Sequence, residues 1–305
     1  MKLETVLQQY DEKSLRLYAK DMHVDNYNKL SIAQLSKQLS QKLLQDAHIN
    51  QRLSILDDQI YRVLLQILDD KELDQQDNTY IEKLIALDLV YLQDDEVYIV
   101  DEIKDIVTAL RNDTTWSLHR SKMVWLLKCQ QVIAHYWGTC SIEQLQQLLL
   151  LNPVYTSEDS IEELLVQIPI GERQVTLHNH CIQWNSYAAY QRLIEYQPID
   201  SDHYVPSVEE INDLYQYDFD IQQESIQQLR DIILQKTKLT PEETETCMHD
   251  IWNSLSYGLS DDIVQEIVNL TQLSPTDISD NLRGQLEINT RKFIYKGHTY
   301  KELYD

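Results

Sequence analysis

Glycine is scarce in this chain, with five residues in 305, against a usual share of roughly 7%. Glycine supplies positive φ angles and lets a backbone approach phosphates closely. Its scarcity therefore argues against a P-loop, a Rossmann turn and a glycine-rich β barrel. Helices are the expected main building material, and a mainly α fold follows.

Cysteine pairs and long apolar runs are also missing. The four cysteines stand far apart without a C-x-x-C spacing, at Cys129, Cys140, Cys181 and Cys247. This pattern is typical of reduced cysteines in a cytoplasmic protein. The apolar run at residues 148–151 is far shorter than the roughly 20 residues of a membrane span. The first residues also lack the apolar core of a signal peptide, so we expect a cytoplasmic protein with no membrane contact.

Positive charge is in deficit, and the formal net charge is −24. Eight Lys and Arg residues stand against six Asp and Glu in 1–53, five against sixteen in 54–115, five against eight in 116–200, and eight against twenty in 201–305. The negative electrostatic potential of such a chain disfavours non-specific binding to nucleic acid or anionic lipid. Only residues 1–53 carry more basic than acidic residues. We expect each of the four segments to form a domain.

Residues 1–53 read as a small helical module. Helices are expected at 3–9, 12–21 and 32–44, with Ser31 capping the last. The patterns at 14–20 and 27–35 resemble the Rho termination factor N-terminal and SAP-type helix-loop-helix modules, whose members often touch nucleic acid. The residues that would carry such binding here are Lys13, Arg16, Lys20, Lys29, Lys37 and Lys42. The alternative is a solvated face on a small docking module.

Residues 54–115 predict two helices followed by a hairpin. Ser54 is placed to cap an apolar stripe at helical spacing over 56–68, and a shorter stripe covers 81–85. Two β-prone runs, 89–92 and 97–100, then surround a polar corner. Helix, helix and hairpin make a winged-helix plan, although the polar linker at 73–77 is too short for a full middle helix.

The outward residues of this unit are acidic where a DNA-binding wing would be basic. The second helix is expected to turn Thr79, Glu82, Lys83 and Ala86 outward, and the hairpin tip carries Asp94, Asp95 and Glu96. Carboxylates at the tip would face phosphates without any release of counterions. Groove reading by this unit is therefore not expected.

Residues 116–200 repeat the plan. A helix is expected over 122–137, ending at Gly138, with further helices capped by Ser141 and Ser157. A hairpin follows with strands at 175–177 and 181–184. The outward side of its third helix is expected to be wholly acidic, with Glu158, Asp159, Glu162 and Glu163.

Residues 201–305 predict an acidic helical domain. Thr240 to Glu243 form a capping box with proline at the first helical position, while Ser260 and Ser274 are placed to cap later helices. The closing Thr299 and Glu302 form a T-x-x-E box. Arg291 and His298 beside it fit a ligand or partner site, and the alternative is a structural clasp that docks Tyr300 and Leu303 on the preceding helices.

That tail, with Tyr204 to Ser207 and the turn at 257–260, resembles a family of uncharacterised Gram-positive bacterial and prophage-associated proteins. Their tails read N-N-T-R and then G-H-T-P-x-E-L. This chain has Ile288 for the first asparagine and Tyr300 for the proline. Some relatives continue into a SEC-C metal-binding tail, which does not follow here. The resemblance brings no established activity.

No motif predicts catalysis or a bound cofactor. His178, His180 and Cys181 have zinc-compatible side chains, but their spacing matches no standard finger and favours a polar hairpin tip. Asp218 and Asp220 lack the remaining ligands of an EF-hand loop. Carboxylate pairs arise by chance among 50 acidic residues, so no metal site and no catalytic pair is assigned.

The expected function is that of a non-enzymatic cytoplasmic interaction or regulatory protein. Nineteen tyrosines favour protein contact, because tyrosine combines a large contact area with a polar tip. One alternative is a nucleic-acid-associated transcription regulator anchored through residues 1–53. Another is an acidic nucleic-acid mimic that binds a basic protein through the hairpin tip and the acidic third helix.

Overall fold

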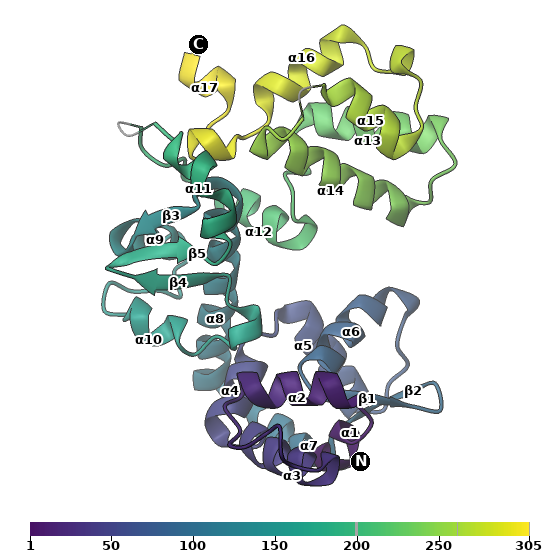
Figure 1. The fold of residues 1–305 in the computed structure, drawn as a ribbon, viewed down its shortest axis with the longest axis vertical. Coiled ribbons are helices and arrows are strands. Elements are labelled where there is room, and N and C mark those ends of the chain that lie inside the picture. Colours follow the sequence, from purple (N-terminus) through teal and green to yellow (C-terminus); the bar gives the residue numbers. More distant parts are fainter. Residues whose placement is uncertain (199–200, 261, 305) are drawn as a thin grey trace. The chain divides into compact units, whose positions relative to one another are not determined.

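The computed structural model describes residues 1–198, 201–260 and 262–304. It is mainly helical with two small antiparallel sheets (Figure 1), which confirms the expected class. The chain divides into two compact units, one of residues 1–124 with 166–172 and the other of 125–165 with 173–305. Within the described ranges, no helix is long and apolar enough to cross a bilayer.

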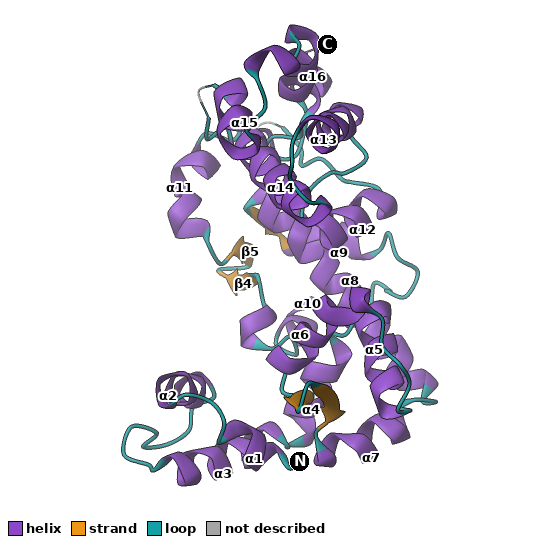
Figure 2. Cartoon of the chain, turned by 90° about the vertical axis from the view of Figure 1, so that its right-hand side faces the viewer, coloured by secondary structure: helices purple, strands orange, loops and turns teal. Residues whose placement is uncertain are grey.

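The first unit is made of short helices and one hairpin, drawn with orange strands in Figure 2. Its elements are α1 (Leu3–Leu7), α2 (Glu12–Asp21), α3 (Ile32–Leu43), α4 (Asp46–Ser54), α5 (Asp58–Leu68), η1 (Gln75–Asp77), α6 (Asn78–Ala86), β1 (Val90–Gln93), β2 (Glu96–Ile99), α7 (Asp101–Leu110), the start of α8 (Thr114–Val132) and η3 (Ile170–Glu172). The sequence-predicted helix, helix and hairpin of residues 54–100 are therefore present.

Helix caps in the first unit follow local sequence, with one correction. Ser31 caps α3 in a reciprocal box with Gln34, as expected. Ser54, however, is the last residue of α4 and does not cap α5. The cap is Asp57, whose carboxylate accepts from the backbone amides of Gln59 and Ile60 at 2.9 Å each. Asp57 wins because it stands immediately before the first helical turn, where orphan amides need an acceptor.

The core of the first unit lies under α5, α6 and the hairpin. Val63 and Leu64 of α5, Leu84 of α6 and Ile99 of β2 are almost completely buried. The hairpin pairs Val90 with Ile99 and Gln93 with Glu96, so it closes on a two-residue turn. Its apolar end is fixed in the core, and its acidic tip projects from it.

The second unit continues from α8 and is helical around a three-stranded sheet. Its further elements are the π-helix η2 (Ile133–Trp137), β3 (Thr139–Ser141), α9 (Ile142–Leu149), α10 (Ile161–Leu165), β4 (Val175–His178), β5 (Cys181–Trp184), α11 (Tyr187–Glu195), α12 (Val208–Tyr217), α13 (Glu224–Lys236), α14 (Pro241–Tyr257), α15 (Ile263–Thr271), η4 (Pro275–Asp277), α16 (Asp280–Asn289), η5 (Phe293–Tyr295) and α17 (Tyr300–Tyr304). The strand order is β3-β5-β4.

Gly138 ends the long helix, as the sequence predicts. Its φ is +71°, and a Cβ atom there would lie 2.7 Å from Cζ of Phe293 and 2.9 Å from the Ile194 side chain. Both the left-handed backbone and the close approach require glycine. The chain can then turn at once into β3, which pairs with the hairpin strand β5.

Several expected caps in the second unit are replaced by a neighbouring residue. Ser160, not Ser157, accepts from the Glu163 amide at the start of α10. Asp262, not Ser260, caps α15. Ser274 caps only the 3-10 turn η4, and Ser279 caps α16. In each case a capping side chain closer to the first turn reaches the orphan amides.

Candidate interaction surfaces

Two of the six N-terminal cations hold the module together. Arg16 donates from Nη1 to the Tyr27 carbonyl at 2.6 Å and from Nη2 to the Leu30 carbonyl at 3.1 Å, and it also pairs with Glu12 at 2.7 Å. Lys42 donates from Nζ to the His23 carbonyl at 3.2 Å. Both side chains therefore fix the loop between α2 and α3.

The other four cations of this set are exposed to solvent. They are Lys13, Lys20, Lys29 and Lys37. Lys13 and Lys20 lie two turns apart on α2 and so share a helix face. The part of the chain that the structure describes gives none of the four an ion-pair partner within 4 Å. These lysines, without Arg16, are what the module can offer to an anion.

A buried polar cluster joins the N-terminal module to the hairpin unit. The Asp88 carboxylate, 1% exposed, accepts from the Tyr10 hydroxyl at 2.7 Å and from the Tyr18 hydroxyl at 2.6 Å. Arg52, 5% exposed, donates to the carbonyls of Leu87 and Leu43 at 2.8 Å each. Burial raises the pKa of Asp88 and of both tyrosines and lowers the pKa of Arg52. The local sequence does not predict the burial of Asp88, because the residues that enclose it come from distant parts of the unit.

The hairpin tip is acidic and exposed, as the sequence predicts. Asp94 and Asp95 form the turn with φ angles of +53° and +63°, a conformation that aspartate tolerates better than most residues. Glu96 beside them accepts a hydrogen bond from the Tyr98 hydroxyl. The tip thus presents three carboxylates, two from the turn and one from the first residue of β2.

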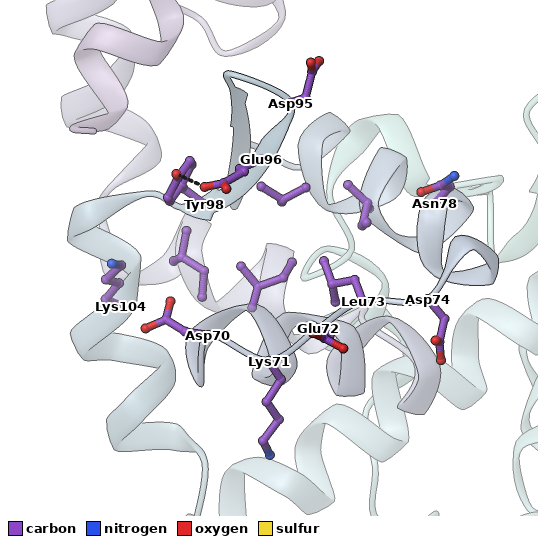
Figure 3. Close-up of a pocket in the computed structure, with 14 residues that line it drawn as sticks. Asp70, Lys71, Glu72, Leu73, Asp74, Asn78, Asp95, Glu96, Tyr98 and Lys104 are labelled. Carbon is purple, nitrogen blue, oxygen red and sulfur yellow. Dashed lines mark hydrogen bonds between the residues drawn. The ribbon is translucent and has the colours of Figure 1, made fainter.

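A groove of about 610 Å³ lies beside this hairpin (Figure 3). One wall is the linker from Asp70 to Asp74, and the other is residues 95–99 of the hairpin. Ile67 of α5 and Ile81 of α6 contribute apolar floor. Five carboxylates line it, namely Asp70, Glu72, Asp74, Asp95 and Glu96, against the two cations Lys71 and Lys104.

Lys71 contributes little to neutralising this groove. Its ammonium pairs with Asp69 at 3.2 Å, and Figure 3 shows the side chain extending away from the hairpin. Arg111 also donates two bonds to Asp69, at 2.8 and 2.9 Å. Hydrogen bonds from Arg111 and Lys71 lower the pKa of Asp69 to about 2. The groove therefore keeps an excess of negative charge.

On the outward face of α6, Thr79, Glu82 and Ala86 are exposed, whereas Lys83 is paired within the chain. Lys83 forms an ion pair with Glu172, which belongs to the segment Val166–Glu172 of the same unit. Gln51 of α4 also donates to the Val166 carbonyl at 3.3 Å. The one cation on the outward side of α6 is therefore already matched by a carboxylate.

The acidic residues near α10 do not form one helix face. The helix has five residues, so Glu158 and Asp159 precede it, while Glu162 and Glu163 lie on it. Asp159 accepts from the amide and hydroxyl of Thr156, at 2.8 and 3.2 Å, and so shapes the preceding turn. Glu158, Glu162 and Glu163 are exposed.

The polar turn between β4 and β5 is formed by Asn179 and His180 in left-handed conformations. The Asn179 amide contacts Nε2 of His178 at 3.1 Å. Among the residues that the structure describes, no three His, Cys, Asp or Glu side chains converge on a point where a metal ion could sit.

Arg291 is enclosed by the segments that the tail resemblance singled out. Its guanidinium lies 3.4 Å from the Tyr204 ring centroid and pairs with Glu210 at 2.9 Å and Glu302 at 3.1 Å. Burial alone would raise the pKa of Glu210, but hydrogen bonds from the Ser207 amide, Tyr204 and Arg291 lower it overall. Arg291 thus has a structural role, because it links α12 to the C-terminal helix α17.

The C-terminal residues around Arg291 only partly match the expected clasp. Thr299 and Glu302 do form the reciprocal capping box, and His298 contacts the Asp202 carbonyl at 3.1 Å. Tyr300, expected to dock inward, is 47% exposed. It contacts Tyr304 instead, with ring centroids 4.6 Å apart, because a five-residue helix can turn few side chains inward.

Sequence reasoning missed a His–Asp–His cluster in the second unit. Asp218, with a φ of +62° at the end of α12, lies 2.9 Å from Nε2 of His135 and 3.4 Å from Nε2 of His249. Burial opposes ionisation of Asp218, but the two histidines hold its pKa well below the usual range. The Asp218 hydrogen bond raises the pKa of His249. Three residues so distant in sequence carry no local signal.

Comparisons with protein-family models, with curated proteins and with solved structures found no significant match for this chain. Function must therefore be argued from the surfaces described above.

Proposed function

We propose that this chain is a non-enzymatic interaction or regulatory protein whose two winged-helix-like units contact protein. The observation that carries the proposal is the charge on two surfaces of the first unit, helix α6 and the hairpin tip. Its α6 face has its single cation paired with Glu172, and its hairpin tip exposes Asp94, Asp95 and Glu96. In winged-helix proteins that bind DNA, these are the two elements that meet the duplex.

Electrostatics supports protein contact over groove contact. DNA carries one negative charge per roughly 1.7 Å of duplex, and binding gains from the release of its counterions by Lys and Arg. A tip of three carboxylates would instead add repulsion at the closest approach. A protein surface bearing Lys or Arg would be attracted by the same carboxylates.

A salt titration of nucleic-acid binding tests this proposal. Fluorescence anisotropy with a labelled DNA duplex and a labelled RNA strand is measured between about 50 and 200 mM salt. We expect weak binding without a steep salt slope. A steep slope that the double variant Lys13→Gln, Lys20→Gln abolishes would overturn the proposal. The matched control is Lys238→Gln, Lys301→Gln, which removes the same charge elsewhere.

A nucleic-acid-associated regulator remains the second candidate, because Lys13, Lys20, Lys29 and Lys37 are exposed. Binding through them would lose about one unit of salt slope for each lysine removed. Arg16 is unsuitable as a probe, since its replacement would release the Tyr27 and Leu30 carbonyls and disturb the module.

A further inference from the structure

One carboxylate joins the C-terminal end of helix α12 to two other helices of the second unit. Asp218 follows the last residue of α12 and lies 2.9 Å from Nε2 of His135 in the π-helix η2. It also lies 3.4 Å from Nε2 of His249 in α14. The next residue, Phe219, is 1% exposed. The turn after α12 is therefore held in place both by a buried ring and by the contacts of Asp218 with two imidazoles.

The start of α12 is held by contacts that do not titrate near neutral pH. Glu210 pairs with Arg291 at 2.9 Å and accepts from the Tyr204 hydroxyl at 2.8 Å. Burial opposes ionisation of Glu210, but its hydrogen bonds and the Arg291 charge lower its pKa overall. Arginine stays protonated in proteins. A change of pH near 7 therefore acts on the Asp218 end of the helix and leaves the Glu210 end unchanged.

The ring of His249 lies between two carboxylates. Its Nε2 faces Asp218, and its Nδ1 lies 3.3 Å from Oδ1 of Asp250. A neutral imidazole has one N–H and one lone pair, so it can donate to only one of these carboxylates. The lone pair would then face the other negative charge. An imidazolium donates to both, so this geometry favours the protonated ring.

Two further polar groups around the cluster fit a protonated His249. Nδ2 of Asn253 lies 3.0 Å from Nε2 of His249, and its buried Oδ1 has no partner among the described residues. Rotation of this amide by half a turn supplies an acceptor for the imidazolium. The Tyr257 hydroxyl donates to the Ala134 carbonyl at 3.1 Å. Burial raises the pKa of Tyr257, so this phenol stays neutral and does not compete for the charge.

His135 is enclosed more deeply than His249. It is 9% exposed, the Trp252 ring lies against it with centroids 5.5 Å apart, and its buried Nδ1 has no partner in the described part of the chain. Burial disfavours a charged ring, and a protonated Nδ1 would be a buried donor without an acceptor. His135 therefore donates to Asp218 from Nε2 as a neutral ring, and His249 is the member of the cluster that changes charge near neutral pH.

We propose that the Asp218 turn is a pH-sensitive switch, in which protonated His249 holds the C-terminal end of α12 against α14 and loss of that proton loosens residues 218–223. The Asp218 hydrogen bond raises the pKa of His249 above its usual 6.5. The contact is thus fully formed below pH 6.5 and is lost as pH rises through the folded-state pKa. The inference goes beyond the proposed function, because it concerns regulation within the second unit.

Proton NMR of the full chain tests the charge on His249. The ring resonance that disappears in His249→Gln is followed from pH 5 to 9, and its midpoint should lie above 6.5. Asp218→Asn should lower this midpoint by about 0.5–1 pH unit, since asparagine tolerates the φ of +62° at this position. Asp250→Asn removes an exposed carboxylate and should lower it by about 0.3. The matched control is Asp231→Asn, an exposed position on α13, which should leave it unchanged.

Hydrogen exchange tests whether this charge holds the turn. Rates for residues 214–223 are converted to protection factors, which remove the effect of pH on intrinsic exchange. We expect about two- to threefold more protection at pH 5.5 than at pH 8.5 for this partly exposed pair. The difference should disappear in His249→Gln and persist in Asp231→Asn. Protection at the start of α12 should not change with pH.

Three outcomes would overturn the switch. They are a His249 midpoint at or below pH 6.5 in the unaltered chain, equal protection of residues 214–223 at both pH values, and a pH-dependent difference that persists in His249→Gln. If Asp218→Asn does not fold, the exposed Asp250→Asn still decides the NMR test against its control. No partner takes part in these measurements, so the proposed contact with protein stands or falls separately.

Discussion

Arg291 shows how a single side chain can look functional in sequence and be structural in the fold. Its Nη1 donates to Glu302 and to the Gly297 carbonyl, its Nη2 donates to Glu210, and its guanidinium lies over the Tyr204 ring. A planar guanidinium satisfies this geometry better than an ammonium, which is a compact point charge. The guanidinium is therefore engaged in contacts within the chain that hold the C-terminal residues in place.

We expect Arg291→Lys to lower the free energy of unfolding by about 1–3 kcal/mol, through lost forked bonds and lost ring stacking. Urea unfolding followed by tryptophan fluorescence measures it. The matched control is Arg283→Lys, which alters an exposed pair with Glu287 on α16 at 3.1 Å. The control should cost less than about 0.5 kcal/mol. Equal losses in the two variants would contradict the structural role.

The Asp218 cluster predicts a pH-dependent contribution from His249. The folded-state pKa of His249 is raised above its usual 6.5 by Asp218, so its stabilisation is complete below pH 6.5 and is lost as pH rises through the folded pKa. Asp218 has a lowered pKa, so its own contribution persists above its usual 3.8 and is lost on further acidification. The two contributions coincide between pH 4 and pH 6.5.

We therefore expect His249→Gln to reduce stability more at pH 5.5 than at pH 8.5, by about 0.5 kcal/mol for this partly exposed pair. Urea unfolding at both pH values gives the difference. His178→Gln, in the exposed β4–β5 turn, is the control and should show no pH-dependent change. A His249→Gln penalty that is the same at both pH values would exclude this role for His249.

At the scale of elements, helical periodicity and turn chemistry predicted much of the first unit. The stripes of α5 and α6 and the β1–β2 hairpin are present near their expected bounds. Helix α4 was missed because only Ile49 and Leu53 supply apolar contacts at helical spacing, and long-range bonds from Arg52 complete it. Helix α7 does carry a local signal, with Ile103, Ile106, Val107 and Leu110 at helical spacing.

The second unit was harder to predict because its sheet includes a strand without a pattern. β3 has three residues, too few to show alternation, and it forms only because Gly138 turns the chain onto β5. The expected interaction surfaces were also only partly predictable from the sequence. The exposure of the acidic tip followed from local sequence, whereas the pairing of Lys83 with Glu172 depends on contacts across 89 residues.

The Asp88 cluster connects three helices, α2, α4 and the end of α6, through buried hydrogen bonds. We expect Asp88→Asn to lower the free energy of unfolding by about 1–3 kcal/mol, since one tyrosine hydroxyl would then face an N–H donor. Asparagine tolerates the +54° φ at this position, so the change isolates the carboxylate. Urea unfolding measures the loss, and hydrogen exchange should speed up in α2.

Asp70→Asn is the control for this prediction. Asp70 also has a positive φ, of +50°, but it is exposed. Its replacement should change stability by less than about 0.5 kcal/mol. Unchanged exchange in α2 of the Asp88→Asn variant would mean that the cluster does not join these helices.

At the scale of the whole molecule, self-repulsion and local ion pairs make opposite predictions for salt. A net charge of −24 destabilises the folded chain through repulsion that extends over the Debye length, which shrinks from about 30 Å at 0.01 M to about 3 Å at 1 M salt. Exposed pairs such as Lys71 with Asp69 are weakened by the same salt, but each contributes only about 0–1 kcal/mol.

Because 24 charges are unbalanced and the exposed pairs are individually weak, we expect screening of repulsion to dominate. Raising NaCl from about 0.02 to 0.5 M should increase Tm by a few degrees, about 1 kcal/mol in the free energy of unfolding. Differential scanning calorimetry measures this, with KCl at equal ionic strength as the control for a specific sodium effect. A fall in Tm with either salt would mean that ion pairs outweigh repulsion.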